Sequence, residues 1–444
     1  MEILLPQKAA FIIDTLQQAG HEAYAVGGCI RDSILGRQPE DWDITTSAKP
    51  DEVKRLFPKT IDTGIQHGTV TVLVEREGFE VTTYRVDGKY EDFRHPKEVT
   101  FTPDLIEDLK RRDFTMNAMA YNRKDGLVDA FGGVSDLNAG IVRCVGCAKQ
   151  RFQEDALRMM RAVRFAAQLG FSIDGETKAA VKELSGTLVH ISAERIQAEL
   201  TKLLVSAHPE QMRTLYELGI TGVMLPEFDR MMRAAQDNPH HCYTVGGHTI
   251  AALMHTPNDK ILRLAVLLHD VAKPACRSRG EDGRDHFHGH PQLGGKMAGQ
   301  ILRRLKYDND TISKVCRLVQ WHDDNPPLLE KSVRRAVVRA GQEAYPAIFA
   351  VKRADILAQS AYKRLEKLEY LKGYEALYQR ILEKRQCLTL KELAVNGSDL
   401  IAMGLKPGPK MGQVLKELLE VVLEEPGQNQ KDILLSKAAE ILSF

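Results

Sequence analysis

Two aspartates that follow a glycine turn are the first residues whose spacing suggests chemistry. The turn, which includes Gly28, comes after the apolar run Ala23–Val26, and Asp41 and Asp43 lie one short helix further on. Alternate side chains of a β-strand share one face, so a strand here, predicted over Trp42–Thr45, would direct both carboxylates to one point. Such a pair offers hard oxygen ligands to Mg²⁺ on a triphosphate, and glycines let the backbone approach the phosphates. The pattern predicts a site for phosphoryl or nucleotidyl transfer.

An Asp-x-Asp pair alone is more often a solvated acidic loop, but the preceding Gly-Gly turn and helix make this pair specific. The stretch resembles the nucleotidyltransferase superfamily that includes DNA polymerase β. Its Gly-Gly-x-x-Arg-Asp opening is similar to that of class II tRNA nucleotidyltransferases and bacterial poly(A) polymerases. The resemblance implies that Asp41 and Asp43 are catalytic Mg²⁺ ligands. It also implies that Gly28 and Arg31 cradle the triphosphate.

A second motif runs from Asp108 to Met119 and includes Arg-Arg-Asp-Phe-Thr-Met-Asn-Ala-Met, which begins at Arg111. Two arginines beside an aspartate can simply begin a surface helix, but this run matches the second signature of the same family. The resemblance implies that Arg112 contacts the incoming nucleotide, because a guanidinium suits phosphate or sugar oxygens. It also implies that Asp113 helps to hold the metal site or the ribose. Asn117 can bind ribose hydroxyl groups or cap a helix.

A third motif places two acidic and three basic side chains at helical spacing. They are Glu154, Asp155, Arg158, Arg161 and Arg164, on one predicted helix. Spacings of three, four and seven residues put side chains on a common face, where Asp155 would pair with Arg158. On a generic helix this pattern is an exposed, salt-bridged face. Beside the first two motifs it favours a cationic stripe that faces a triphosphate.

In class II CCA-adding enzymes, which this motif resembles, the Glu-Asp-x-x-Arg run acts as a protein template for the incoming base. A carboxylate at Asp155 can accept a hydrogen bond from the amino group of cytosine or adenine, while Arg158 donates to the neighbouring ring acceptor. Guanine and uracil present the reverse order, so the pair would accept C and A and reject G and U. The resemblance implies that Glu154 orients Arg158, and that Arg161 and Arg164 complete triphosphate binding.

The polar segment Tyr90–Lys97, between the first two motifs, is predicted to be a mobile loop. In the family, a flexible loop at this place is associated with the switch from C to A addition. Its presence favours synthesis of the full CCA end. The sequence Arg94-His95-Pro96 departs from the Arg-Arg-Pro that family members often carry here.

Nine of the 14 histidines lie between residues 240 and 322, an unusual density for a plain scaffold. Histidine and aspartate together suit a divalent metal, and the His…His-Asp pattern resembles the HD phosphohydrolase superfamily. The implied metal ligands are His248, His269, Asp270 and Asp355. His288, His290 and His322 could converge with them, and Mn²⁺, Ni²⁺ or Mg²⁺ would be the second divalent metal of the protein. Phosphate ends of RNA, such as 2′,3′-cyclic phosphates, are the implied substrates, and a degenerate domain kept for its helices is the alternative.

The composition is that of an ordinary soluble protein of 444 residues, with 27% charged residues and a formal net charge of +1. Any RNA-binding surface must then be a local patch. No apolar run approaches a membrane span and the N-terminal sequence does not resemble a signal peptide, so we expect no membrane partner. Seven scattered cysteines favour a reducing, cytoplasmic location.

The order of the sequence signals predicts an α+β fold with four domains. Residues 1–145 alternate strand and helix signals and form the predicted polymerase-β-like head with a mixed sheet, whereas helical periodicity dominates the rest. The predicted helical parts are a nucleotide-template neck at 146–225, an HD-type domain at 226–385 and an RNA-binding tail at 386–444. Strands are predicted at Ala23–Val26, Trp42–Thr45, Thr69–Val74 and Phe79–Arg85, with a hairpin turn at Arg76-Glu77-Gly78 and a helix that begins at Pro50.

The resemblance that the motifs carry together implies a tRNA nucleotidyltransferase that adds or repairs the 3′ CCA end of tRNA from CTP and ATP with Mg²⁺. An A-adding or CC-adding enzyme or a poly(A) polymerase would share this fold and stays an alternative. A more distant alternative is an HD phosphohydrolase whose head only binds RNA, but intact Asp41 and Asp43 argue against it. The sequence does not indicate an oligomeric state.

Overall fold

The computed structural model describes residues 2–88, 99–281 and 283–442. The chain divides after Pro226 into two compact units, each with its own core. The loop predicted at Tyr90–Lys97, with its expected mobility and its role in the switch to A addition, lies outside the described residues. Among the described residues, no helix is long and apolar enough to cross a membrane.

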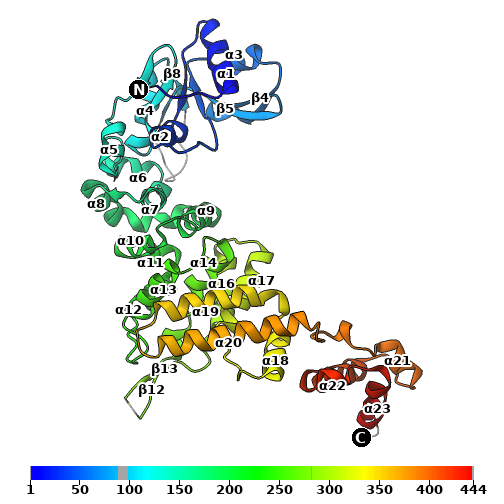
Figure 1. The fold of residues 1–444 in the computed structure, drawn as a ribbon. Helices are drawn as coiled ribbons and strands as arrows, with labels where there is room; N and C mark the ends of the chain where they lie inside the picture. The colour runs from blue at the N-terminus through cyan, green and yellow to red at the C-terminus, as the bar shows by residue number, and fades with distance from the viewer. Residues whose placement is uncertain (1, 89–98, 282, 443–444) are drawn as a thin grey trace. The chain divides into compact units, whose positions relative to one another are not determined.

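A seven-stranded mixed sheet forms the N-terminal part of the first unit (Figure 1). Its strands, in spatial order, are β3 (Thr60–Gly64), β4 (Thr69–Val74), β5 (Glu77–Thr83), β2 (Ile44–Thr46), β1 (Ala23–Val26), β8 (Ala120–Asn122) and β9 (Gly126–Val128). The β2 and β5 strands run parallel, and the other neighbours run antiparallel. Val26, Tyr84, Leu109 and Ala120 are buried together in the core beside this sheet.

The predicted strands Ala23–Val26 and Thr69–Val74 are confirmed to the residue, but the strand predicted at Trp42–Thr45 begins later, at Ile44. Asp41 and Asp43 therefore precede the strand instead of alternating within it. The first paired residue of β2 is Ile44, which pairs with Ala25. The carbonyl of Asp43 still accepts a hydrogen bond from the Val26 amide, at 2.9 Å. That bond keeps the aspartate segment beside β1.

The hairpin between β4 and β5 turns one residue earlier than predicted. Glu75 and Arg76 have φ angles of 50° and 72°, so the two-residue loop lies at these positions. Positive φ at both residues is typical of one of the two turn types favoured in two-residue hairpins, whose backbone twist matches that of the strands. Glu77 and Gly78 consequently belong to β5, where Gly78 pairs with Leu73.

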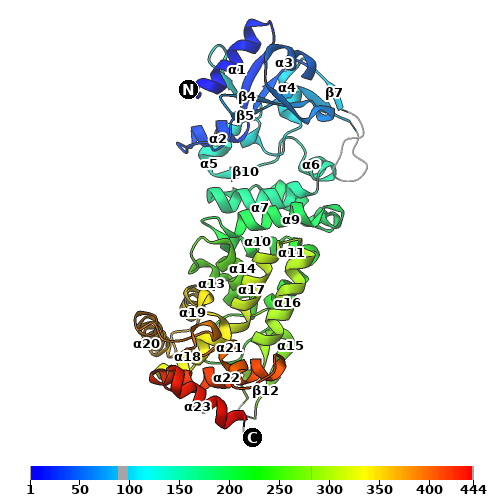
Figure 2. The ribbon, with the colours of Figure 1, turned by 90° about the vertical axis from the view of Figure 1, so that its right-hand side faces the viewer.

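The remainder of the first unit is mostly helical. Its helices are α1 (Gln7–Gln18), α2 (Gly28–Ile34), α3 (Pro50–Leu56), α4 (Leu105–Lys110), α5 (Gly133–Ala139), α6 (Ala148–Glu154), α7 (Leu157–Leu169), α8 (Gly175–Leu184), α9 (Ala193–Leu204), α10 (Met212–Glu217) and α11 (Ile220–Met224). The helix predicted to start at Pro50 is confirmed, with proline at its first turn, where a missing N–H has no cost. Figure 2 shows α7 and α9 side by side, and they pack closely.

The second unit is helical and contributes the histidine-rich region. Its helices are α12 (Pro226–Arg233), α13 (Val245–Met254), α14 (Lys260–Leu268), α15 (Lys273–Cys276), α16 (His290–Arg304), α17 (Asn309–Trp321), α18 (Glu330–Ala340), α19 (Tyr345–Ala358), α20 (Arg364–Glu383), α21 (Gly397–Ala402), α22 (Pro409–Glu424) and α23 (Lys431–Leu442). This unit has one short strand pair, β12 (Ser278–Arg279) with β13 (Asp285–His286), while the first unit has two such pairs, β6 (Arg85–Asp87) with β7 (Val99–Phe101) and β10 (Ile141–Val142) with β11 (Ser172–Ile173). The α+β prediction is confirmed, with the large sheet in the head and helices beyond it.

Candidate functional site

The glycine turn holds the first helix of the site against an arginine. Gly27 precedes α2 with φ +83° and ψ −128°, a conformation open to glycine, and Gly28 is the first residue of the helix. A Cβ atom added at Gly27 would lie 3.1 Å from a terminal nitrogen of Arg112. Residue 27 is therefore glycine both because of its backbone angles and because the Arg112 guanidinium lies so close.

Three carboxylates influence one another where β2 and β5 begin to run side by side. Asp43 precedes Ile44, which pairs with Val81, so Glu80 is at the matching position of the neighbouring strand. Desolvation by the surrounding protein raises the pKa of Asp43, Arg112 lowers it, and the negative charges of Glu80 and Asp41 raise it further; the net pKa is raised. The arrangement favours a cation among these carboxylates.

A cavity of about 590 Å³ lies beside Asp41 and Asp43. It is lined by Gly28, Cys29, Arg31, Asp32, Arg37, Gln38, Glu40, Asp41, Asp43, Arg164, Gln168, Leu169, Lys202, Ser206 and Ala207. The structure thus brings Gly28, Arg31, Asp41, Asp43 and Arg164 of the predicted residues to one hollow. Acidic groups and cationic groups share its wall, as a site for a metal-bound polyphosphate requires.

The second motif forms a network that positions arginines. Asp113 accepts hydrogen bonds from the Asn117 amide at 3.1 Å and from Arg161 at 2.7 Å, and Asn117 accepts one from Arg31 at 2.8 Å. Burial opposes ionisation of Asp113, but Arg161 and Asn117 outweigh it and lower its pKa to about 2. Asp113 and Asn117 are thus engaged with the protein itself, and Asn117 lies in a 3₁₀ turn and caps no helix.

Arg112 is held by the buried acid that begins the motif, Asp108. Its guanidinium lies 3.6 Å from Asp108, which also binds Arg111 at 2.8 Å and is fully buried. The Nε atom of Arg112 is buried, and no described residue accepts a hydrogen bond from it.

The third motif is divided between two helices, which corrects the predicted single helix. α6 ends at Glu154 and α7 begins at Leu157, because Asp155 has extended backbone angles and its carboxylate caps the new helix at the Leu157 amide. The predicted pairing of Glu154 with Arg158 is present, at 2.5 Å. The carboxylate of Asp155, however, is held by Arg195 of α9 at 2.7 Å.

The two remaining arginines extend along α7 from this break. Arg161 binds Asp113, whereas Arg164 binds Glu199 of α9 at 2.8 Å and stacks 3.5 Å above the ring of Phe165. Stacking and ion pairing fix a planar guanidinium in one orientation. Arg164 therefore presents a defined edge to the cavity that it lines.

Several residues of the site are absent from the sequence-based set. They are Gly27, Glu80, Asp108, Arg195 and Glu199. Gly27 and Asp108 lie within the first and second motifs, so position alone gives a signal for them. The other three belong to elements distant in sequence, and strand register or helix packing brings them to the site.

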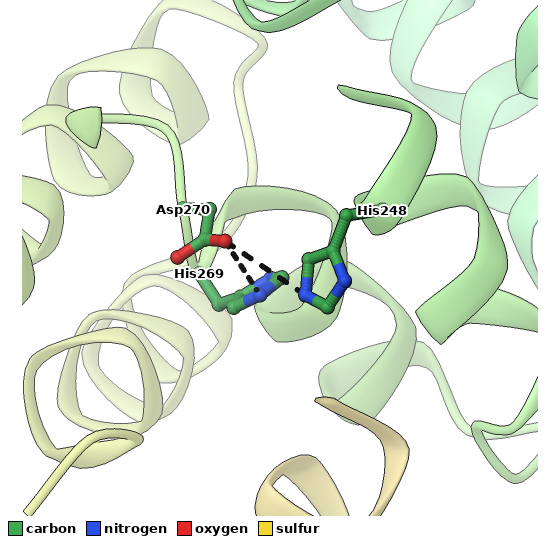
Figure 3. Close-up of side chains that lie close together, drawn as sticks. All are labelled: His248, His269 and Asp270. Carbon is green, nitrogen blue, oxygen red and sulfur yellow. Dashed lines mark ion pairs between the residues drawn. The ribbon is translucent and has the colours of Figure 1, made fainter. Parts of the chain in front are cut away.

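A second group of titratable side chains lies in the second unit. His248 is on α13, His269 and Asp270 directly follow α14, and Asp355 is on α19. His248 Nε2 lies 2.7 Å from Asp355, and His269 Nε2 lies 3.2 Å from Asp270. Figure 3 shows the Asp270 carboxylate directed at both imidazole rings. The structure thus brings all four residues predicted for the HD-type site together.

This cluster is buried beneath two hollows. His248, His269 and Asp270 are each about 1% exposed. A cavity of about 370 Å³ reaches Asp270 and Asp355, and a second of about 360 Å³ reaches Asp355 and Lys352. His288 lines the first cavity. A small ligand can therefore reach the otherwise buried carboxylates of Asp270 and Asp355.

Three segments of the chain match models of known domains. Residues 23–143 match the Poly A polymerase head domain, residues 170–232 match the RNA and SrmB-binding site of polymerase A, and residues 291–438 match domain 2 of tRNA nucleotidyltransferase. Together they span both units.

Comparison with curated proteins and solved structures covers almost the entire chain. It is 37% identical to a CCA-adding enzyme of Lactiplantibacillus plantarum, over 97% of this chain and 95% of that one, and 35% identical to one of Lactobacillus helveticus, over 96% and 95%. A Bacillus stearothermophilus CCA-adding enzyme in complex with CTP matches with a TM-score of 0.74 and 30% identity over 99% of this chain and 98% of that chain. A Thermotoga maritima enzyme complexed with tRNA, at 19% identity and a TM-score of 0.59 over 99% and 97%, shares the fold. This chain belongs to the CCA-adding enzymes, a family of tRNA nucleotidyltransferases.

Proposed function

We propose that this protein builds the 3′ CCA end of tRNA from CTP and ATP. The observation that carries the proposal is that Asp41, Asp43 and Arg164 line the same cavity. Glu154 and Asp155 lie in the same unit, where α6 ends. The activity named for relatives that match nearly the whole chain supports it. tRNA, CTP and ATP are accordingly the proposed partners.

Asp41 and Asp43 are the residues that would hold Mg²⁺ in the head, with Glu80 beside them. The donor set fits, because burial and, to a smaller extent, the neighbouring carboxylates raise the pKa of Asp43, and a hard divalent cation would stabilise these carboxylates in their charged form. A cation bound there neutralises triphosphate charge and makes the RNA 3′-hydroxyl easier to deprotonate. Arg31 and Arg164, which line the same cavity, would bind phosphate oxygens.

Asp155 and Arg158 are the residues that would select the base. Each is oriented by a separate partner, Arg195 and Glu154 respectively. A carboxylate acceptor beside a guanidinium donor matches the amino group and ring acceptor of cytosine and adenine. Because the chain itself would supply this pattern, base choice needs no nucleic-acid template.

The proposed activity is tested with three tRNA substrates that end at the discriminator base, at C or at CC. Each is incubated with single nucleotides and with mixtures, and the products are sequenced. We expect C, C and A to be added in order and extension to stop after A, with Asp43→Asn as an inactive control. Addition of A alone, of C alone, or of long A tails would instead support the A-adding, CC-adding or poly(A) polymerase alternative.

A cytoplasmic location is proposed on the same grounds, because tRNA ends are the substrate. The cysteines support a reducing environment, since the seven of them are all free.

The second unit favours a second function, metal-dependent hydrolysis of phosphate esters. The observation that favours it is the convergence of His248, His269, Asp270 and Asp355 beneath two cavities. Two imidazoles and two carboxylates fit Mn²⁺, Ni²⁺ or Mg²⁺, with softer metals favoured by the histidines. Lys273, Lys352 and Lys367 line these cavities and would bind phosphate oxygens. Phosphate or 2′,3′-cyclic phosphate ends of RNA are the proposed substrates.

This function is tested by incubating the metal-loaded protein with phosphomonoester and 2′,3′-cyclic phosphate probes. We expect hydrolysis that depends on the added metal and disappears in His269→Ala with Asp270→Ala. Absence of cleavage with each of the three metals would reduce the cluster to a scaffold.

A further inference from the structure

Glu199 of α9 lies against two arginines of the neighbouring helix α7. Its side chain is buried, and its Oε2 accepts a hydrogen bond from Nε of Arg164 at 2.8 Å. Its Oε1 lies 3.8 Å from a terminal nitrogen of Arg161. Arg161 and Arg164 are three residues apart on one helix, so their like charges repel each other. One buried carboxylate therefore stabilises two guanidinium groups that would otherwise destabilise this face of α7.

A chain of polar contacts connects Glu199 to the glycine turn of the head. Arg161 donates a hydrogen bond to Asp113 at 2.7 Å. The Asn117 side chain donates to the same carboxylate at 3.1 Å and accepts a hydrogen bond from Arg31, on α2, at 2.8 Å. The carboxylate on α9 is therefore linked, contact by contact, to the helix that follows the glycine turn.

An aromatic ring also contacts these arginines, but it cannot orient them fully. The guanidinium carbon of Arg164 lies 3.5 Å from the ring centroid of Phe165. Those of Arg31 and Arg161 lie 5.0 Å and 5.3 Å from it. The attraction of a cation to a ring face depends little on how a stacked guanidinium is turned in its own plane, whereas a hydrogen bond from Nε depends strongly on it. The bond to Glu199 therefore determines the direction in which each edge of Arg164 faces.

The contacts of Arg164 leave one of its terminal nitrogens for a ligand. Glu199 accepts a hydrogen bond from Nε, and the side-chain oxygen of Gln168 accepts one from Nη1 at 2.8 Å. In the part of the chain that the structure describes, no residue accepts a hydrogen bond from Nη2. Arg164 is only 6% exposed, yet it lines the cavity that Asp41 and Asp43 also line. A phosphate oxygen in that cavity would supply the acceptor that the protein does not.

We propose that Glu199 is a positioning residue for triphosphate binding, because it directs the free edge of Arg164 to the phosphates. The inference rests on the proposed nucleotide addition, whose triphosphate Arg164 would bind. It concerns the phosphates and not the base, since the Asp155 carboxylate is held by a different residue of α9, Arg195. These two residues of α9 are four positions apart, so one face of a single helix orients the proposed base-selecting group and the phosphate-binding group separately.

Binding of inorganic tripolyphosphate tests the inference without a base and without turnover. The full chain carries Trp321→Phe, so that fluorescence of Trp42, which lies between Asp41 and Asp43 in the sequence, reports binding in the head. All titrations contain Mg²⁺. Calorimetry of the same samples measures the dissociation constant independently.

Three substitutions in this background give the expected pattern. Arg164→Met should weaken tripolyphosphate binding roughly 10- to 100-fold, which corresponds to the loss of one charge-assisted hydrogen bond. Glu199→Gln keeps the size of the side chain but loses its charge, so we expect binding to weaken by at least about threefold. Glu194→Gln changes an exposed acid of the same helix, and this matched control should bind like the parent.

The double variant Arg164→Met with Glu199→Gln separates positioning from a general loss of structure. If Glu199 acts through Arg164, the double variant should bind no more weakly than Arg164→Met alone. Losses that add, or parent-like binding by folded Glu199→Gln, would overturn the proposal. Circular dichroism establishes folding. If the glutamine variant does not fold, Glu199→Asp replaces it with the same expected weakening, because aspartate keeps the charge but withdraws it by one methylene.

Nucleotide addition separates this inference from the function on which it rests. In Glu199→Gln we expect KM for CTP and for ATP to rise by the same factor, with discrimination against UTP unchanged. Loss of that discrimination would overturn the proposal, because Glu199 would then act on the base. A parent that adds no nucleotide, while its tripolyphosphate binding follows the expected pattern, would remove the proposed function and leave the inference. Addition of C, C and A with parent-like tripolyphosphate binding in Glu199→Gln would do the reverse.

Discussion

At the residue scale, the proposed base choice depends on the partners that orient Asp155 and Arg158. Asp155 is bound by Arg195, and Arg158 is bound by Glu154, so both template groups are oriented by neighbours before a nucleotide arrives. An oriented pair loses little side-chain entropy when it recognises a base. Selectivity should therefore fall when either template group, or either partner, is removed.

We predict that Asp155→Asn and Arg158→Met each relax base choice as well as slow addition. Asparagine still has an acceptor but adds a donor, so it tolerates the reversed order of uracil and guanine. Loss of one charge-assisted hydrogen bond, about 1.5–3 kcal/mol, lowers kcat/KM for CTP and ATP by roughly 10- to 100-fold. The measurement is kcat/KM for all four nucleotides. If UTP and GTP stayed equally excluded while the rate fell, the segment would only clamp phosphate.

Arg195 is predicted to act through Asp155 and not on the nucleotide itself. Arg195→Met removes two hydrogen bonds from the Asp155 carboxylate, so discrimination against UTP should fall in the same direction as in Asp155→Asn. Arg213→Met, an exposed arginine of the same unit, is the matched control. Discrimination against UTP is also measured for the double variant Arg195→Met with Asp155→Asn. If Arg195 only positions Asp155, the double variant should lose no more discrimination than Asp155→Asn alone. Additive losses would contradict it.

Site residues could be predicted from the sequence where they lie within a motif, but not where only the fold brings them to the site. Asp41, Asp43 and Glu154 lie in motifs whose spacing is itself informative. Glu80 reaches the aspartates only through the parallel register of β5 beside β2, and Arg195 reaches Asp155 only through packing of α9 on α7. A long-range pairing of this kind leaves no local pattern in a single sequence.

At the element scale, several site residues lie in the short segments between helices and strands and not within them. The break at Asp155 separates α6 from α7, and helical periodicity did not predict it because the charged residues keep their spacing across it. The mechanism is visible in the structure, where the aspartate side chain caps the following helix. Similarly, β2 and β5 begin at other residues than predicted, because pairing with neighbouring strands decides where a strand begins.

We predict that Gly27→Ala lowers nucleotide addition more than it lowers stability. Alanine at φ +83° costs about 1–2 kcal/mol, and its Cβ would press on the Arg112 guanidinium. Gly36→Ala is the matched control, because Gly36 has φ +68° at the end of the same helix but open space around a Cβ. Thermal unfolding and kcat/KM are measured for both. Equal losses of activity in the two variants would show that strain alone matters.

We predict that Lys352 of α19 lowers the free energy of unfolding at neutral pH. It is 4% exposed, and burial lowers the pKa of its ammonium group to about 8, against about 10.4 in an unfolded chain. The folded state then binds fewer protons between these values, so the free energy of unfolding rises with pH from about 8 to 10. Lys352→Met should remove that slope and raise the free energy of unfolding at pH 7 by roughly 1–3 kcal/mol, after loss of the hydrogen bond to Asn325.

Fluorescence of Trp321 during urea unfolding, in a Trp42→Phe background, reports the second unit alone. Lys372→Met on the adjoining helix, an exposed lysine, is the control and should change neither slope nor stability. A parent protein whose unfolding free energy stays flat between pH 8 and 10 would contradict the lowered pKa. The metal-free protein is used throughout, because bound cations add their own pH dependence.

At the scale of the whole molecule, the two proposed sites belong to different units. Every residue of the nucleotide site precedes Pro226, and every residue of the histidine cluster follows it. The change from mixed strand and helix signals to helical periodicity predicted two kinds of structure. Convergence of α13, α14, α16, α17 and α19 on Asp270 could not be predicted, because spacings of tens of residues between ligands fix no geometry.

We predict that the two activities are lost independently. Asp41→Asn should reduce CCA addition to below about one hundredth while hydrolysis of a phosphomonoester probe stays unchanged, because a lost metal ligand affects only its own unit. His269→Ala should do the converse for a tRNA that already has a free 3′-hydroxyl. A tRNA blocked by a 2′,3′-cyclic phosphate distinguishes cooperation from coexistence: the intact protein should extend it, His269→Ala should not, and a mixture of the two single variants should restore extension. If the mixture failed while each variant kept its remaining activity, the blocked end would have to pass between sites of one chain.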